Sequence, residues 1–481
     1  MTAQSSLAVR ATVARDATSD GQLDDTNDAD ATSQVARTPL HDAHQAGNEA
    51  SPRSQASSRL ENLPPELRLR LLFSMPDLQT LRSLVHASPT LHAQYRHSRD
   101  RILRAFISRE LDGFLIDAYA THMSRPHELG SPRTNEKITE FTNTYGNWLS
   151  VPESSPDLNS IEPERLRSMS AFYLSVAQPL AHQYCEWALG NFIPAILDFV
   201  TREDFKPTAK DLGIDDLSPQ RSELIRIFRA IYRYETYYNL FGCNEGKREG
   251  ALADEWTNHR LLYRFEPWEA EAVACIQAFI YDKHEEIVER FKDKLYPPNV
   301  RFTLKNGVYR YDEPFHLVAG TNDYLESLLR RGLRTAVHLW ATHDDEELIV
   351  KVRQYLHSNR NLDSTLEDAL SEIAQSTRRY ELDVPPDPRD EMARDRRCMD
   401  FTGDAVPPTT PPLGWVHLWG RGYANIYGEY VPRSVQRWGY VMWNKERWNF
   451  PVGGDRLMEA RCRWPSDDPD VGDMHYSWRP W

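Results

Sequence analysis

Residues able to carry metal or redox chemistry are scattered along this sequence rather than grouped. His86, His92 and His97 lie near one another, but spacings of six and five residues do not bring three imidazoles onto one face of a helix. The five cysteines contain no C-x-x-C pair, which argues against both a metal site and a disulfide framework. The sequence therefore predicts solvated histidines and reduced thiols, with no metal ion and no cofactor.

Three further segments carry residue types found in active sites, and each has a simpler structural interpretation. Gly420, Arg421 and Gly422 resemble the start of a phosphate-binding loop, but no third glycine follows, so we expect a turn. The acidic run 344–347 opens an expected helix, where carboxylates interact favourably with the positive end of the helix dipole. Cys275 has apolar neighbours and is expected to be an inert core thiol. Because no hydrolase, zinc-protease or P-loop motif occurs, the sequence predicts a protein that is not an enzyme.

Charge and hydropathy narrow the class of partner. The chain has 481 residues and a net charge of −14, whereas general binding to nucleic acid requires a basic surface. No apolar run approaches the roughly 18 residues that a membrane span requires, and the first residues lack the continuous apolar core of a secretory signal. We therefore expect no nucleic-acid partner, no membrane partner and a location in the cytoplasm or the nucleus.

One strongly patterned segment, residues 59–104, is expected to form three short helices. In the first helix Leu63, Leu67 and Leu71 recur every four residues, which places them on one face. Two prolines occupy the first turn, where a missing N–H costs nothing, and Asn62 is the expected N-cap. The result is an apolar stripe on a helix of about three turns.

The second and third helices of this segment have their own start signals. Asp77 is expected to cap the second helix, whose Leu78, Leu81 and Leu84 share one face. Ser88, followed by a proline, is expected to start the third helix. A unit of fewer than fifty residues is too small for an independent core, so it should pack against a partner or against the rest of the chain.

With these positions in view, the segment resembles an F-box, in the divergent form common among filamentous-fungal proteins. The matching positions are Leu63-Pro64, Glu66-Leu67, Leu71-Leu72, Met75, Asp77-Leu78, Leu81 and Leu84. The resemblance implies docking to the small Skp-type adaptor of a Skp–cullin–F-box (SCF) ubiquitin ligase. Carried over position by position, it implies adaptor contacts at Leu63, Pro64, Leu67, Leu71, Leu78, Leu81 and Leu84.

Composition divides the rest of the chain. Residues 1–58 contain no aromatic residue and are predicted to be a disordered tail. An α-helical body is expected over 105–381, and the seven prolines of 382–413 indicate a linker or an extended strap across that body. Residues 414–481 form a Trp-rich C-terminal extension. The predicted fold is therefore mainly α: a short three-helix F-box-like module, a large irregular α-helical body and this extension.

The periodicity of apolar residues predicts where the helices of the body lie in the sequence. Candidate helices span residues 164–189, 190–202, 218–240, 268–295, 322–342, 344–358 and 363–381. The helix 218–240 is apolar on most sides and is expected to be central and buried. A helix from Ile102 to Ala118 should join the first module to the body, and residues 124–165 should be a loop with one helix near 138–148. A local hairpin is expected over 301–313.

The tryptophan-rich extension admits two interpretations. Trp438, Trp443 and Trp448 alternate with arginines, and Trp, Tyr and Arg dominate the energetics of protein interfaces, so these tryptophans are candidates for binding a target protein. Alternatively, they pack the extension onto the body, filling space with few residues. The sequence favours packing for most of them.

Together these patterns, with the F-box resemblance, lead to an expected role as substrate receptor of an SCF-type ubiquitin ligase. Such a subunit would bind the Skp-type adaptor and cullin complex through residues 59–104 and an unknown target protein through the body. It would carry out no chemistry itself and would act by positioning the target. The alternative is a non-catalytic helical scaffold or interaction protein in which the F-box-like module is only structural. An enzyme hidden in the helical body is a third alternative, without a supporting cluster of polar residues.

Overall fold

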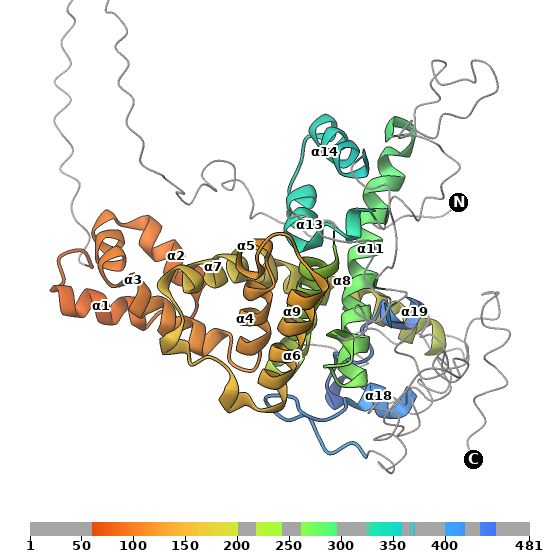
Figure 1. The fold of residues 1–481 in the computed structure, drawn as a ribbon, viewed down its shortest axis with the longest axis horizontal. Coiled ribbons are helices and arrows are strands. Elements are labelled where there is room, and N and C mark those ends of the chain that lie inside the picture. The colour runs from red at the N-terminus through yellow and green to blue at the C-terminus, as the bar shows by residue number, and fades with distance from the viewer. Residues whose placement is uncertain are drawn as a thin grey trace, which may run out of the picture. The chain divides into compact units, whose positions relative to one another are not determined.

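The computed structural model confirms the mainly α-helical fold (Figure 1). It describes residues 60–200, 218–242, 261–295, 327–357, 400–418 and 433–448, with positions 325, 366, 369 and 370. Within these ranges the chain contains no β-strand, and all of them belong to one compact unit, Ser58–Trp481. The expected tail 1–58, the hairpin 301–313 and the turn at Gly420–Gly422 lie outside the described residues.

The first three helices begin largely where their start signals predict. They are α1 (Pro65–Phe73), α2 (Leu78–Ala87) and α3 (Pro89–Glu110). The Asp77 carboxylate accepts a hydrogen bond from the Thr80 N–H at 2.6 Å, and the Ser88 hydroxyl accepts one from the Leu91 N–H at 3.3 Å. Both predicted caps are therefore confirmed, and each satisfies an N–H that the helix leaves without an internal partner.

Helix α3 is longer than expected and connects the first helices to the body. It kinks at Ser98 and ends at Glu110, so the boundary drawn at residue 104 falls inside a helix. Its first part packs against α1 and α2, and it also packs against α7 (Pro163–Phe172). The helix expected to continue to Ala118 stops because the chain turns at Gly113, where φ is +90° and a Cβ atom would lie 2.7 Å from Ile225.

The next elements enclose one side of the body. They are α4 (Leu115–Met123), α5 (Pro126–Leu129), α6 (Asn135–Ser150), α7 and α8 (Gln178–Val200). Single 3-10 turns, η1 (Pro152–Ser154) and η2 (Leu158–Ser160), follow α6, and the π-helical turn η3 (Tyr173–Ala177) separates α7 from α8. The segment 124–165 is thus more helical than predicted, and no break separates the helices expected on either side of residue 190.

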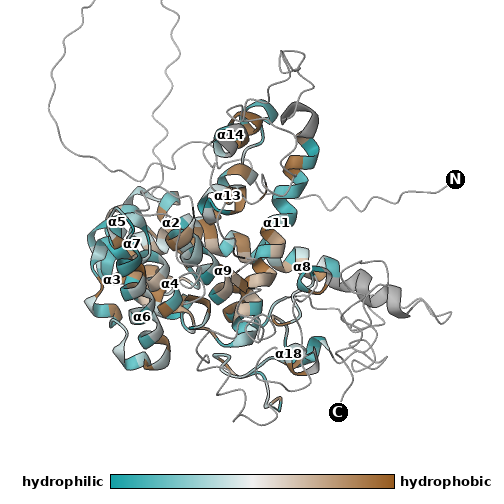
Figure 2. Ribbon diagram, turned by 45° about the vertical axis from the view of Figure 1, so that its right-hand side comes forward, coloured by the Kyte–Doolittle hydropathy of each residue, from teal (hydrophilic) through white to brown (hydrophobic). Residues whose placement is uncertain are grey.

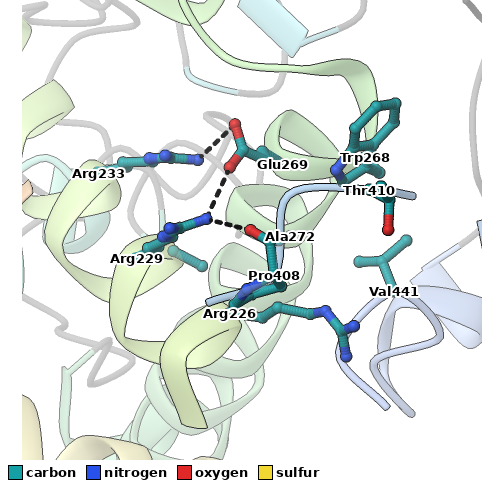
Figure 3. Close-up of a pocket in the computed structure, with 10 residues that line it drawn as sticks. Arg226, Arg229, Arg233, Trp268, Glu269, Ala272, Pro408, Thr410 and Val441 are labelled. Atoms are coloured by element: carbon teal, nitrogen blue, oxygen red, sulfur yellow. Dashed lines mark hydrogen bonds and ion pairs between the residues drawn. The ribbon is translucent and has the colours of Figure 1, made fainter. Parts of the chain in front are cut away.

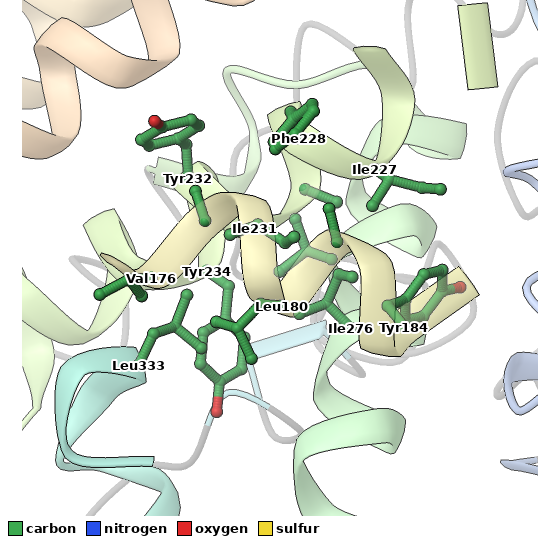
Figure 4. Close-up of a cluster of buried hydrophobic side chains, with 14 of the residues drawn as sticks. Val176, Leu180, Tyr184, Ile227, Phe228, Ile231, Tyr232, Tyr234, Ile276 and Leu333 are labelled. Atoms are coloured by element: carbon green, nitrogen blue, oxygen red, sulfur yellow. The ribbon is translucent and has the colours of Figure 1, made fainter. Parts of the chain in front are cut away.

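Helix α9 (Arg221–Phe241) is the central element, as predicted for residues 218–240. It packs against α4, α8, α11 (Pro267–Leu295) and α13 (Gly332–Trp340). Its apolar side chains meet those of α8, α11 and α13 in a continuous core, whose members include Ile231, Tyr234, Leu180 and Leu333 (Figure 4). Figure 2 shows hydrophobic residues along α4 and α9 and hydrophilic residues over much of the more peripheral α3.

The remaining described elements cover α9 and α11. They are α14 (Asp345–His357), α18 (Leu413–Leu418), α19 (Arg433–Gln436) and η5 (Lys445–Arg447). The helix expected over 322–342 is interrupted before α13 at Gly332, where φ is +74°. The Asp344 carboxylate accepts a hydrogen bond from the Glu347 N–H at 2.7 Å, which confirms the capping role of the acidic run at 344–347.

Residues 400–412, the described part of the predicted linker, lie as a strap across the body. The Asp404 carboxylate pairs with Arg226 of α9 at 2.7 Å, and the Pro408 carbonyl accepts a hydrogen bond from Arg229 at 2.8 Å. The side chain of Pro408 is buried. Of the two alternatives for this proline-rich segment, the strap therefore describes these residues.

A buried ion-pair network joins α4, α9 and α11. The Arg233 guanidinium donates to Asp117 at 2.7 Å and pairs with Glu269 at 3.0 Å, and the Tyr145 hydroxyl donates to the same Asp117 oxygen at 2.6 Å. Arg233 and Asp117 have side chains only 3% exposed, so neither charge is stabilised by bulk water. The adjacent carboxylates, foremost Asp117, outweigh the effect of burial and raise the pKa of Arg233.

We predict that Asp117→Ala destabilises the protein by about 3–5 kcal/mol, because it leaves the buried Arg233 charge with a single carboxylate partner. The matched control is Glu286→Ala, which breaks an exposed ion pair with Lys283 and should cost less than about 1 kcal/mol. Urea unfolding followed by circular dichroism measures both values. Equal effects of the two substitutions would contradict this assignment.

Candidate docking surface

Helix α1 presents an apolar surface at the N-terminal end of the compact unit. The helix begins after Pro64, which is its N-cap, and no side chain caps it, so the expected cap at Asn62 is corrected. The N–H groups of Leu67 and Arg68 bond to the Pro64 carbonyl at 3.0 Å each, which closes the first turn despite the absence of a capping side chain. The two prolines therefore fix the position at which the helix starts.

The predicted contact residues divide into two groups. Leu67 is 44% exposed, Pro64 is exposed, and Leu63, Leu71 and Leu84 are partly exposed. Leu78 and Leu81, by contrast, are each 2% exposed. Both belong to the chain's own hydrophobic core together with Leu72 of α1, so they are removed from the set of partner contacts. The buried face of α2 is the one that packs against α3.

One set of exposed or partly exposed apolar residues in α1 and in the turn before it recurs at short spacing in the sequence, and we term this set the α1 ridge. The α1 ridge comprises Leu60, Leu63, Pro64, Leu67 and Leu71. Sequence analysis missed Leu60, which is 44% exposed and lies in the turn closed by the bond from the Leu63 N–H to the Leu60 carbonyl. Its position three residues before Leu63 was the available signal. Large exposed hydrophobic residues are few among the described residues: Leu60, Leu67, Val151, Val350 and Val406.

Polar contacts, one of them buried, hold the segments on either side of α1 against α3. The Glu110 carboxylate at the end of α3 accepts a 2.6 Å hydrogen bond from the Leu78 N–H, and Arg109 donates to the Met75 carbonyl at 2.8 Å. The Ser88 hydroxyl donates to Glu61 at 2.6 Å. Burial raises the pKa of Glu110, although the bond from Leu78 acts in the opposite direction. These contacts clamp the α1–α2 loop and the turn before α1 onto α3.

The three tryptophans proposed as target contacts are buried instead. Trp438, Trp443 and Trp448 are 3%, 0% and 2% exposed, so the prediction that they bind a target protein is corrected. The Trp443 ring N–H donates to the Trp438 carbonyl at 2.6 Å, and the rings of Trp438 and Trp448 lie 5.3 Å apart. The alternative interpretation, packing, therefore describes these three residues. Their ring surfaces are buried in contacts that hold the C-terminal segment against the body.

A cavity of about 20 Å³ lies between α9, α11 and the strap (Figure 3). It has room for a single water molecule. The arginines that line it are each paired with a carboxylate: Arg226 with Asp404, Arg229 with Glu269, and Arg233 with Glu269 and Asp117. Because these charges are balanced within the chain, the cavity does not favour an anionic ligand, and we assign it a structural role.

The described ranges hold no cluster of side chains suited to a metal ion. There, no three His, Cys, Asp or Glu side chains are placed to hold a metal ion. His86, His92 and His97 are exposed, whereas burial lowers the pKa of the solitary His284 to about 3. Cys275 is fully enclosed, and burial raises the pKa of its thiol well above the ordinary value, as expected for a core cysteine.

Known proteins offer no relative for comparison: no family model, no curated protein and no solved structure matches this chain. The described helices also include none with the length and apolar character needed to cross a bilayer. Functional inference therefore rests on the geometry of the molecule. Two of the large exposed hydrophobic side chains among the described residues, Leu60 and Leu67, belong to the α1 ridge.

One carboxyl group missed by sequence analysis links α11 to the C-terminal segment. Glu271 is half-buried and its carboxyl makes hydrogen bonds with Tyr440 and Gln436, while its buried Oε2 atom has no hydrogen-bond partner. Burial raises its pKa from 4.5 to about 7, and the two hydrogen bonds only partly oppose this. Between these pH values the folded protein holds a proton that the unfolded chain has released, so stability falls as the pH rises through this window.

We predict that Glu271→Gln removes this decline. The wild-type free energy of unfolding should fall by on the order of 3 kcal/mol between pH 4.5 and pH 7, relative to the variant, because the amide does not titrate. Glu346→Gln, which changes an exposed carboxylate on α14, is the control and should leave the wild-type profile unchanged. The check is urea unfolding at half-unit pH steps; parallel profiles for wild type and Glu271→Gln would refute the assignment.

We also predict opposite outcomes for two leucines of the predicted contact set. Leu81→Ala should destabilise the protein by about 2–5 kcal/mol, since it opens a cavity in the core. Leu67→Ala should cost less than about 1 kcal/mol, because a leucine that is 44% exposed loses little packing. Chemical denaturation distinguishes the two substitutions, and a large loss for Leu67→Ala would show that this side chain belongs to the core.

Proposed function

We propose that this chain is the substrate receptor of an SCF-type ubiquitin ligase, which docks a Skp-type adaptor, and through it the cullin, with the α1 ridge. The observation that carries the proposal is the exposure of Leu60 and Leu67 on a module that is otherwise firmly packed onto the body. An exposed apolar ridge is typical of a surface that another protein covers. The F-box resemblance of residues 59–104 supplies the identity of that protein.

In this proposal the chain performs no chemistry. The body binds an unidentified target protein and holds it near the ubiquitin-loaded enzyme, which raises the effective concentration of the target. The complex would act in the cytoplasm or the nucleus. The three buried tryptophans are not part of the target surface, so the target is expected to contact other parts of the body.

The second candidate is a helical scaffold protein whose first three helices are only structural. Two observations favour it: Leu78 and Leu81 face the chain's own core, and α3 runs from this module into the body with only a kink at Ser98. Under this alternative the α1 ridge would be a residual apolar surface without an adaptor. The two candidates therefore differ in whether the exposed leucines bind the adaptor.

We predict that the purified full-length chain captures a purified Skp-type adaptor at a 1:1 ratio and that Leu67→Asp weakens capture at least 10-fold. The introduced charge would be desolvated at the centre of the interface, which costs about 2 kcal/mol or more. Val350→Asp is the matched control, because Val350 is 51% exposed but lies on α14. Size-exclusion chromatography and calorimetric titration measure the complex.

The experiment separates the two candidate functions. Circular dichroism should show that both aspartate variants are folded, since both positions are exposed in the native protein. Capture that is retained in Val350→Asp and lost in Leu67→Asp supports the receptor. A folded wild-type chain that captures no adaptor would overturn the proposal and favour the scaffold.

A further inference from the structure

The charge of the first helices is opposite to that of the rest of the chain. Residues 60–110 contain eight arginines, no lysine and five acidic residues, a net charge of +3. The whole chain carries −14, so the other residues together carry −17. A basic end on an acidic molecule produces a directional electrostatic field, which acts on a charged partner before contact.

The acidic residues of this region are largely engaged within the chain. Asp77 caps α2, Glu110 accepts from the Leu78 N–H, Glu61 accepts from Ser88, and Asp100 pairs with Arg167. Only Glu66 is both exposed and without such a contact. The negative charges of residues 60–110 are therefore mostly committed to the fold.

Three arginines of the same region remain available. Arg70, Arg82 and Arg96 are exposed, and none makes a side-chain hydrogen bond or an ion pair with the described residues. Arg70 lies on α1 three residues after Leu67, so the two side chains are neighbours on the helix surface. The exposed apolar side chain is thus flanked by an uncommitted positive charge.

We propose that the α1 ridge docks an acidic protein face, in which carboxylates flank an apolar groove, and that the exposed arginines Arg70, Arg82 and Arg96 of the same three helices attract that face. This inference rests on the proposed function and specifies the chemistry of the adaptor surface. The leucines supply affinity by burial, and the arginines accelerate encounter and set orientation. The acidic remainder of the chain repels an acidic partner from other approaches.

The composition of the surface favours a protein over a nucleic acid. Arginine suits both carboxylates and phosphates, because its planar guanidinium forms paired hydrogen bonds with either group. A phosphate backbone, however, offers no apolar surface to cover Leu60 and Leu67. Burial of these leucines beside arginines requires a partner that is both acidic and apolar, as a protein surface can be.

The test measures association and dissociation rates of the full-length chain with the purified Skp-type adaptor between 50 and 500 mM salt. The wild-type association rate should fall about 10-fold over this range, since screening weakens long-range attraction. The triple variant Arg70→Glu, Arg82→Glu, Arg96→Glu should associate about 10-fold more slowly at low salt, with a change in dissociation below threefold. Lys445→Glu, an exposed charge reversal outside this surface, is the control and should change either rate less than twofold.

The outcomes distinguish this inference from the proposed function. Leu67-dependent binding whose rate responds neither to salt nor to the three arginines would overturn the inference and leave the receptor function intact. Absence of binding by the folded wild type would overturn both. A duplex DNA probe is measured in parallel; salt-sensitive retention of DNA that is lost in the triple variant would assign the arginines to nucleic acid and overturn the inference.

Discussion

The packing of α4, α9 and α11 is organised around a buried cation, the guanidinium of Arg233. Burying a charge of this kind is costly unless carboxylates and hydrogen bonds surround it. Asp117 from α4 and Glu269 from α11 meet this requirement at 2.7 and 3.0 Å, and the ring of Phe265 lies 4.3 Å from the guanidinium carbon. Because the two carboxylates come from different helices, α4, α9 and α11 can pack in only a narrow range of arrangements. Apolar burial supplies the stability of this core, and the ion pairs restrict its geometry.

The same constraint extends along α9. Arg226 and Arg229 precede Arg233 by seven and four residues, so the three arginines lie on one side of α9. Arg226 pairs with Asp404 of the strap, and Arg229 donates a hydrogen bond to the Pro408 carbonyl. Arg229 also donates to the Gly113 carbonyl at 2.8 Å, at the turn that connects α3 to α4. The position of α3, and with it the orientation of the N-terminal helices, is therefore tied to the central helix.

Local signals in the sequence predicted the starts of α2 and α3 but could not identify the long-range partners of the helices. The caps at Asp77 and Ser88 depend on groups three residues away, so the sequence predicts them directly. The partner of Arg233 at Asp117 is 116 residues away, and no periodicity identifies it. Within the docking surface, apolar spacing grouped Leu81 with Leu67, although one faces the core and the other faces solvent. Which apolar face of α1 and α2 is buried depends on how these two helices pack against α3, and the apolar spacing alone does not contain this information.

The exposed leucines of α1 follow from helix geometry. Leu72 faces the core and is fully buried, so Leu67, five residues earlier and about 140° away around the helix, points to a different side. Leu67 is 44% exposed on that side, and the bonds from Glu110, Arg109 and Ser88 hold the segments that flank α1 in place. A surface held in this way loses little conformational entropy on binding, which increases the affinity available from a small apolar area. On the proposed function, the rigid attachment of α1 to α3 is therefore what allows a few exposed leucines to suffice for docking.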